Sequence, residues 1–301
     1  MAIHRWFRIL ERQNKESVIR KTLIDNNFLE SNSMAHSNFV LTHADYGIWK
    51  NKIKDYDRPI FMYPHSIDSW KCYDYGLQPW KKITCNFVAS NTVKDILKFL
   101  KYPQPVEVIG FPYLPKVLPL KPTTGNNILF ATTHATMGVI DDDFKKGNLD
   151  IQGYLSSIMD TYNITVYLHE SFEVSGIPGI PGINYKFSNL TIKNAIDIIN
   201  KNDIIFAKGT FMYLAIALGK PTISYMESEP FHPNFSINRK IDHPELMDLW
   251  KYPIDLYKYE DPSQALIDCQ NPDIISTWKQ NVLGGSFDAD KFIKAISRYV
   301  S

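Results

Sequence analysis

The feature that most constrains the fold of this chain is the alternation of short apolar runs with longer amphipathic segments. The runs are rich in Ile, Val, Phe and Tyr, and their length is that of buried strands. They occupy residues 39–43, 59–63, 84–90, 106–110, 127–132, 164–169, 184–188, 203–208 and 221–225. Strands that alternate with helices pair in parallel through crossover connections. The pattern therefore predicts an α/β fold with doubly wound, mainly parallel sheets.

The segments between these runs carry apolar residues at helical spacing. In residues 91–101, for example, Val93, Ile96 and Leu100 fall on one side of a helix. Helices are expected at residues 91–101, 151–162, 191–201 and 211–218, and in a helical C-terminal tail at 262–269, 273–281 and 288–300.

Residues 1–30 are predicted to form a helix with a basic surface. Between residues 5 and 21, six Lys and Arg side chains stand against two Glu side chains, a local charge of +4. One interpretation is a helix that packs its apolar side on a sheet. The other is a basic amphipathic helix in peripheral contact with an anionic membrane.

A proline-rich stretch divides the chain. Four prolines between residues 112 and 122 prevent both a helix and a central strand, which is typical of a semi-rigid linker. The length of 301 residues also suits two domains. We therefore predict an N-terminal α/β domain at residues 1–117 and a second at 118–301 that includes the helical tail.

Charge and cysteine usage narrow the class of protein. Lys and Arg total 33 against 32 Asp and Glu, and a net charge of +1 disfavours a surface that coats nucleic acid. The three cysteines are far apart and form no CxxC pair, so neither a zinc ribbon nor a disulfide framework is indicated. The sparse cysteines and the charged N-terminus, unlike a signal peptide, favour a cytoplasmic protein.

Polar side chains follow several of the predicted strands. His65, His134 and His169 each stand at a strand end, and Lys208-Gly209-Thr210 joins a strand to a helix. Ligands of doubly wound sheets bind outside the carboxyl ends of the strands. Imidazoles can donate to phosphate or move protons, and a Gly-Thr helix start offers free amides to an anion. A capping role alone is the other interpretation of the Gly-Thr pair.

These motifs together resemble GT-B glycosyltransferases. The strand, turn and helix that end in Ala217-Leu-Gly-Lys-Pro221 are similar to the donor-domain signature, above all in the CDP-glycerol glycerophosphotransferase branch, with UDP-GlcNAc 2-epimerases as more distant relatives. The likeness spans about residues 58 to 225. Its other segments are Tyr63-Pro-His-Ser66, Asn86–Ser90, Val108–Pro112, Ile128–His134 and Leu168-His169.

The resemblance implies a GT-B fold, in which two Rossmann-like domains face a cleft. It implies that His65 is the catalytic base of an acceptor-side domain and that the second domain binds a nucleotide-sugar or CDP-polyol donor. The residues expected to bind that donor are Thr133, His134, His169, Lys208, Gly209, Thr210 and Glu227.

The chain departs from that branch at three positions that bear on the donor. Ser66 stands where the branch has Gly, Glu170 where it has Pro, and Ala207-Lys-Gly-Thr210 where it has an Asp-Tyr-Ser-Ser turn. Glu227 is placed either to reach the ribose or sugar or in a surface loop. The donor is a co-substrate, and no cofactor or metal is expected, since relatives of this fold generally need none. The Asp-x-Asp pairs at 55–57, 141–143 and 288–290 are interpreted as chance.

The acceptor is left open by the sequence. A glycan, a lipid-linked glycan or another hydroxyl compound is compatible with it, and so is modified nucleic acid. Aromatic residues 70, 73, 75 and 80 form either a platform for the acceptor or part of the core. Two other functions remain: an epimerase or hydrolase that turns over a nucleotide sugar, and a non-catalytic module that binds one.

Overall fold

The computed structural model describes most of the regular structure of the chain. The described residues are 4–9, 18–43, 53–63, 70, 73, 79, 81–112, 125–131, 153–169, 184–188, 192–207, 209–224, 245–246, 254, 256 and 259–300. At residues 8–9, 168–169, 184–188, 192–193, 210 and 262 only the backbone is described. Within these ranges no helix combines the length and the apolar character needed to cross a membrane.

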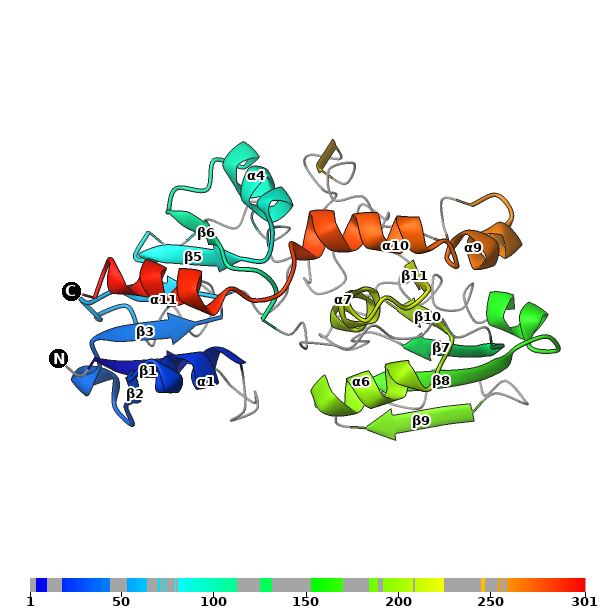
Figure 1. Ribbon diagram of the computed structural model, residues 1–301, viewed down its shortest axis with the longest axis horizontal. Helices are drawn as coiled ribbons and strands as arrows, with labels where there is room; N and C mark the ends of the chain where they lie inside the picture. Colours follow the sequence, from blue (N-terminus) through cyan, green and yellow to red (C-terminus); the bar gives the residue numbers. More distant parts are fainter. Residues whose placement is uncertain are drawn as a thin grey trace. The chain divides into compact units, whose positions relative to one another are not determined.

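The chain divides into two compact units (Figure 1). The first comprises residues 1–116 together with 280–301, and the second comprises residues 117–279. The assignment of the whole stretch 118–301 to the second domain is therefore wrong for its last segment. The physical reason is the burial of apolar side chains, since Phe292, Ala295 and Ile296 lie in the core of the first unit.

The first unit is built on a six-stranded sheet with the order β2-β1-β3-β4-β5-β6. All its strand pairs are parallel. The strands are β1 (Arg5–Ile9), β2 (Leu29–Glu30), β3 (Phe39–Thr42), β4 (Ile60–Met62), β5 (Cys85–Val88) and β6 (Val106–Val108). Its helices are α1 (Val18–Asp25), the 3-10 turn Met34–His36, α4 (Asn91–Phe99) and α11 (Ala289–Ser297).

The prediction of one helix over residues 1–30 is wrong. Residues 5–9 form β1, an interior strand hydrogen-bonded to β2 and β3, and only residues 18–25 of the described part are helical. Trp6 explains the difference, because its side chain is fully buried in the core of the sheet. Long-range burial thus outweighs a local pattern that fits a helix. The continuous basic helix expected to touch a membrane is absent from the described residues.

The second unit is built on a five-stranded parallel sheet with the order β11-β10-β7-β8-β9. The strands are β7 (Asn127–Ala131), β8 (Asn163–His169), β9 (Asn184–Ser188), β10 (Ile204–Ala207) and β11 (Thr222–Ser224). Its helices are residues 153–158, α6 (Ile192–Asn200), α7 (Thr210–Ala217), α9 (Pro262–Asp268) and α10 (Pro272–Trp278), and a π-helix at Lys279–Leu283 leads on to the first unit.

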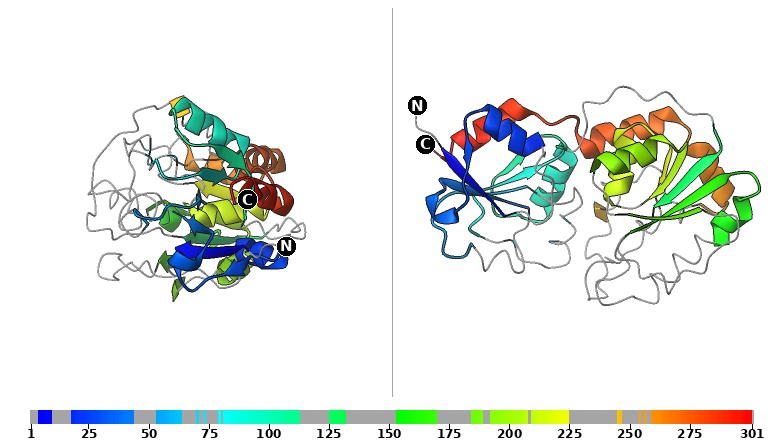
Figure 2. Two further views of the ribbon diagram at one scale, coloured as in Figure 1. Left: turned by 90° about the vertical axis from the view of Figure 1, so that its left-hand side faces the viewer. Right: turned by 90° about the horizontal axis from the view of Figure 1, so that it is seen from below.

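Each sheet reverses its strand order once, which is the mark of a doubly wound fold. In the second sheet, β7, β8 and β9 run outward in one direction, and the chain then returns to place β10 on the other side of β7. Figure 2 shows helices on both faces of this sheet. Leu155 and Leu266, from residues 153–158 and from α9, pack on the face that carries Phe130 and Phe206. Helix α7 lies along β10 and β11.

Two glycines in succession return the C-terminal segment to the first unit. Gly284 and Gly285 both have positive φ angles, 67° and 98°. Beyond them, Phe111 N donates to Gly285 O at 3.2 Å and Asp288 N donates to Ile109 O at 2.8 Å. Helix α11 then packs Phe292 against Phe87, with ring centroids 5.0 Å apart.

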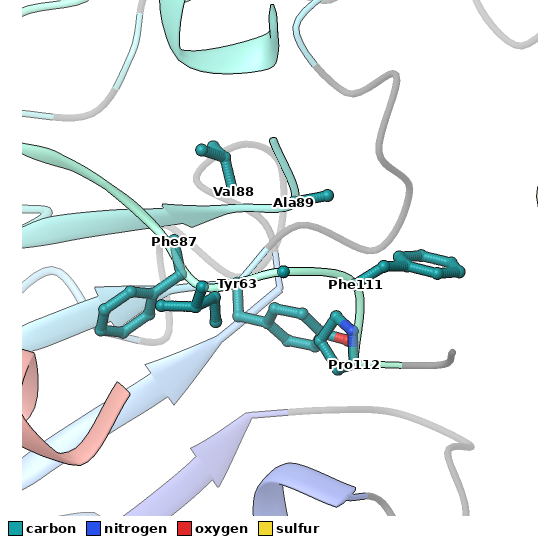
Figure 3. A pocket seen from close by; sticks show the side chains of 8 residues that line it. Tyr63, Phe87, Val88, Ala89, Phe111 and Pro112 are labelled. Atoms are coloured by element: carbon teal, nitrogen blue, oxygen red, sulfur yellow. The ribbon is translucent and has the colours of Figure 1, made fainter. Parts of the chain in front are cut away.

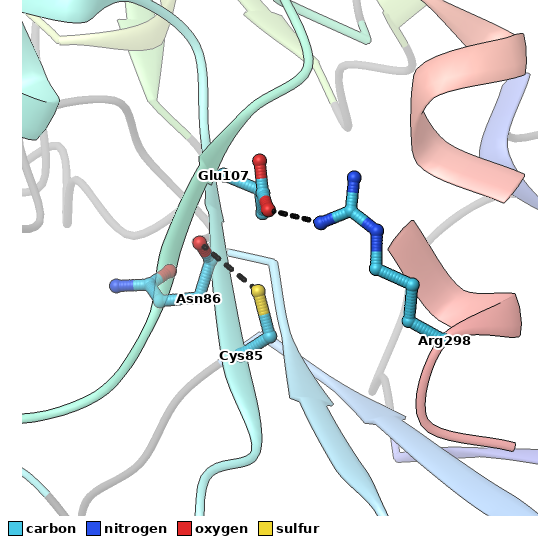
Figure 4. Close-up of polar contacts among 4 residues, drawn as sticks. All are labelled: Cys85, Asn86, Glu107 and Arg298. Carbon is cyan, nitrogen blue, oxygen red and sulfur yellow. Dashed lines mark hydrogen bonds and ion pairs between the residues drawn. The ribbon is translucent and has the colours of Figure 1, made fainter. Parts of the chain in front are cut away.

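An ion pair at the surface also joins the C-terminal segment to the sheet of the first unit. Arg298 Nη1 lies 2.8 Å from Glu107 Oε1 on the edge strand β6 (Figure 4). Since about half of the Arg298 side chain is exposed, this pair contributes little, and the buried aromatic contacts hold the tail.

Because the C-terminal segment packs closely at Gly284, this position should tolerate substitution far less well than Gly285. A Cβ at Gly284 would lie 2.3 Å from the backbone oxygen of Ala89, whereas a Cβ at Gly285 meets nothing within 4 Å. Both substitutions impose a strained φ, at a cost of about 1 to 2 kcal/mol. We expect Gly284→Ala to lower the free energy of unfolding clearly more than Gly285→Ala, as measured by urea denaturation. Equal losses would show that the tail does not lie closely against residues 89–90.

Candidate functional site

The site is built on the carboxyl edge of the second sheet, where the strand order reverses between β7 and β10. These strands are direct neighbours, with Phe206 opposite Phe130. Their last residues, Ala131 and Ala207, therefore lie side by side at one edge of the sheet, where the chain leaves both strands. A reversal point of this kind leaves a crevice, because the connections from the two strands turn to opposite faces of the sheet.

Gly209 shapes the connection that follows β10. Its φ of 59° and ψ of −138° belong to a region that other residues rarely adopt, and it is the N-cap residue of α7. Tyr213 N donates to Gly209 O at 3.1 Å, which is the first hydrogen bond of the helix. Among the described residues, no atom lies within 4 Å of where a Cβ at Gly209 would stand.

Helix α7 is held firmly in place. Its residues Met212 to Ala217 are all buried, and Tyr213 stacks on Trp278 of α10 with ring planes 9° apart. At its other end, Gly219 has a φ of 70°, and Lys220 N donates to Ala215 O at 3.0 Å. A helix fixed on all sides presents the N–H groups of its first turn at a defined position, where the helix dipole favours an anion.

Strand β8 brings one predicted residue to the same edge. Tyr167 pairs with Ala131, so His169, two residues further, extends beyond the end of β7. For His169 and Thr210 the described part is the backbone, which places both at the carboxyl edge. The remaining predicted residues lie outside the described ones: His65, Thr133, His134, Lys208 and Glu227.

The carboxyl edge of the first sheet carries a small apolar hollow (Figure 3). It lies at the ends of β4, β5 and β6. Its volume is about 10 Å³, which leaves room for about one water molecule. Its lining residues are Tyr63, Phe87, Val88, Ala89, Ile109, Gly110, Phe111 and Pro112. Tyr63, which precedes the predicted base His65 by two positions in the sequence, is one of them.

The structure adds two strand-end residues that the sequence reasoning did not select. His43 follows β3 directly, and since Tyr63 N donates to Thr42 O at 2.8 Å, it lies level with the residues that lead to His65. Ser224 is the last residue of β11 and is fully buried. Their signal in the sequence is a polar residue that closes an otherwise apolar run.

Two other sequence features have structural roles. Trp70 is buried and Tyr73 packs on the core of the first unit, which favours the core interpretation for these two aromatics. Asp288 caps α11 by accepting from Lys291 N at 2.9 Å, which explains one Asp-x-Asp pair without a metal. No group of three or more His, Cys, Asp and Glu side chains that could hold a metal ion occurs among the described residues.

Comparison with known proteins shows the fold. No family model matches the chain, and neither does any curated protein sequence. Among solved structures, the chain is similar to the UDP-GlcNAc 2-epimerase of Methanocaldococcus jannaschii in complex with UDP-GlcNAc and UDP, with a TM-score of 0.59 and 11% identity over 98% of this chain and 99% of that one. It is also similar to the wall teichoic acid polymerase TagF, with a TM-score of 0.54 and 12% identity over 99% and 88%.

A third similar structure is the spinosyn rhamnosyltransferase SpnG complexed with spinosyn aglycone. The TM-score is 0.51 and the identity 9%, over 87% of this chain and 73% of that one. The prediction of a GT-B type fold with two α/β units and a helical C-terminal region is therefore confirmed.

The two described cysteines are unsuited to nucleophilic catalysis. Burial raises the pKa of Cys85 to about 12, and the Glu107 carboxylate adds to the effect. Burial likewise raises the pKa of Cys269 to about 12, followed by the effect of Asp268. Cys85 lies within β5, where its Sγ is 3.9 Å from Asn86 O (Figure 4). Since the thiolate is the reactive form, neither side chain is a nucleophile at neutral pH.

This burial predicts slow modification of both thiols. At pH 8, iodoacetamide should leave Cys85 and Cys269 unmodified in the native protein and modify both in guanidinium chloride. Peptide mass spectrometry measures each site separately. Rapid modification of either cysteine without denaturant would contradict its burial and its raised pKa.

Proposed function

We propose that this protein transfers a sugar, or a polyol phosphate, from a nucleotide-activated donor to an acceptor hydroxyl. The observation that carries the proposal is the reversal point between β7 and β10, where Gly209, with its positive φ, begins a buried helix at the carboxyl edge of the sheet. A diphosphate is the ligand that such a helix start favours. The shared fold with enzymes whose structures contain UDP or UDP-GlcNAc supports the same donor class.

On the donor side, the helix amides would receive the diphosphate. Lys208 and Thr210 flank Gly209 in the chain, and His169 extends from the neighbouring β8. Thr133 and His134 follow β7, the strand beside β10. Negative charge grows on the nucleotide as it leaves, so donors directed at the diphosphate bind the transition state better than the ground state. Glu227, which follows β11, would bind the ribose or the sugar.

On the acceptor side, His65 would be the general base. Its imidazole would take the proton of the acceptor hydroxyl while the oxygen forms a bond to the transferred group. The bond between that group and the nucleotide breaks, and the nucleotide leaves with the electron pair. No metal ion is needed in this scheme, because backbone amides and cationic side chains balance the charge. We therefore expect nucleotide binding to be unaffected by EDTA.

A second candidate is a nucleotide-sugar epimerase or hydrolase, because the fold is shared equally with a UDP-GlcNAc 2-epimerase. Such an enzyme would convert its donor without an acceptor. Incubation of the purified protein with UDP-sugars or CDP-glycerol alone therefore separates the two functions. Turnover of a donor without added acceptor would favour the second.

The two ends of helix α7 offer a matched test of donor binding. Gly209 and Gly219 both have positive φ, and a Cβ at either one would meet no atom of the described residues within 4 Å. Both Ala variants should therefore lose similar stability. Only Gly209→Ala should weaken nucleotide binding, by about tenfold or more, because it displaces the amides of the first turn.

The measurement is a thermal-shift screen of the wild type and both variants with UDP, CDP, GDP, ADP and CMP. A ligand that binds only the folded state stabilises the protein by RT ln(1 + [L]/Kd), so the melting temperature rises with ligand concentration and with affinity. We expect one base to give the largest shift in the wild type and in Gly219→Ala. Absence of any shift in the wild type would overturn the proposed donor site.

The assignment of His65 predicts a separate effect on turnover. His65→Ala should leave the nucleotide-induced thermal shift intact and lower transfer to the acceptor by about 100-fold or more. The readout is release of the nucleotide in the presence of acceptor: the nucleoside diphosphate if a sugar is transferred, and CMP if a polyol phosphate is transferred from a CDP-polyol. If the variant retains wild-type turnover, another residue is the base, and His43→Ala, at a neighbouring strand end, is the variant to measure next.

A further inference from the structure

Ser224 is a buried polar residue with an unused hydrogen-bonding group. Its side chain is 0% exposed, and its Oγ has no hydrogen-bond partner among the described residues. The backbone N–H of the same residue is satisfied, because it donates to Ile254 O at 2.7 Å. Within the described residues, the side-chain hydroxyl of Ser224 therefore lacks a hydrogen-bond partner while its backbone N–H has one.

The register of the sheet places this hydroxyl beside the helix start. Ser224 pairs with Ala207, the last residue of β10, and Gly209 follows two positions later. Successive residues of a strand point to opposite faces of the sheet. Ile223 points into the apolar cluster that contains Phe206, so Ser224 points to the opposite face, along which α7 packs.

The neighbouring threonine shows what a satisfied hydroxyl on this strand looks like. Thr222 lies two residues before Ser224 on the same face and is also fully buried. Its Oγ1 donates to Lys220 O at 2.7 Å. Burial of a hydroxyl costs free energy unless it forms a hydrogen bond. Within the described part of the chain, Thr222 forms such a bond and Ser224 does not.

We propose that Ser224 is a ligand-binding residue whose hydroxyl donates to a phosphate oxygen of a nucleoside diphosphate held at the N-terminus of α7. This inference rests on the proposed function and adds a residue from β11 to a site otherwise formed by β7, β8 and β10. The phosphate would supply the acceptor that the described residues do not offer. A hydrogen bond from a hydroxyl to a charged oxygen is stronger than one between neutral groups, so the ligand gains from it.

The proposal predicts opposite effects on stability and on binding. Ser224→Ala removes a buried group that has no partner, so the melting temperature of the ligand-free protein should stay the same or rise. The affinity for the nucleotide should fall by about tenfold to a hundredfold, because a charge-assisted hydrogen bond is lost. The matched control is Thr222→Val, which should lower the melting temperature and leave affinity within about twofold.

The experiment measures melting temperatures without ligand and dissociation constants by calorimetry for UDP, CDP, GDP and ADP. It uses the full chain as wild type, Ser224→Ala and Thr222→Val. If the wild type binds none of these nucleotides, the proposed function itself fails. If it binds one, and Ser224→Ala binds it equally well, the inference fails while the function stands. A ligand-free Ser224→Ala that melts as low as Thr222→Val would also overturn the inference, since its hydroxyl would then serve the fold.

Discussion

The structure depends on parallel strand pairing. Every strand pair in both sheets is parallel, so each connection must carry the chain back to the edge where the previous strand began. The carboxyl ends therefore collect at one edge of each sheet. Ala131, Ala207 and Ser224 are separated by many residues in sequence, yet they finish on three adjacent strands. The topology alone thus brings the residues that follow these strands to one edge of the sheet, whatever their side chains are.

The opposite edge of the second sheet is used for stability. Asp203 Oδ2 accepts from Asn127 N at 2.9 Å and from Asn127 Nδ2 at 2.8 Å, where β7 and β10 begin. The Lys220 ammonium donates to Asn202 O at 2.7 Å. Burial lowers the pKa of Lys220, and the Asp203 carboxylate acts in the opposite direction. Buried polar groups are paired at the amino edge, which contrasts with the unused hydroxyl of Ser224 at the carboxyl edge.

The sequence predicted those elements whose apolar pattern reflects burial on both faces. Strands β7 and β10 were found for this reason, since four residues in each are fully or almost fully buried. Strand β1 was missed because Arg5 and Arg8 interrupt its apolar residues, and only tertiary contacts show that Trp6 is buried. The return of α11 was missed as well, because it depends on Phe292 meeting Phe87, a contact that no local pattern records. The placement of Gly209 and of the backbone of His169 and Thr210 at the carboxyl edge was predictable from topology, whereas the hydroxyl of Ser224, which has no partner among the described residues, is visible only in the structure.

The residues that carried the family resemblance turn out to serve the fold. In the segment Ala217–Pro221, Gly219 takes the positive φ that ends α7, and Lys220 fixes the end of α6 through backbone oxygens. A motif of this kind determines how the strand, the helix and the next strand are connected. It does not determine which ligand binds, because proteins that share this connection bind different ligands. Under the proposed function, donor choice would therefore reside in residues 208–210 and in the polar residues at the ends of the neighbouring strands. Residues 207–210 are also where the sequence departs from the glycerophosphotransferase pattern, so the shared fold does not carry over that branch's donor.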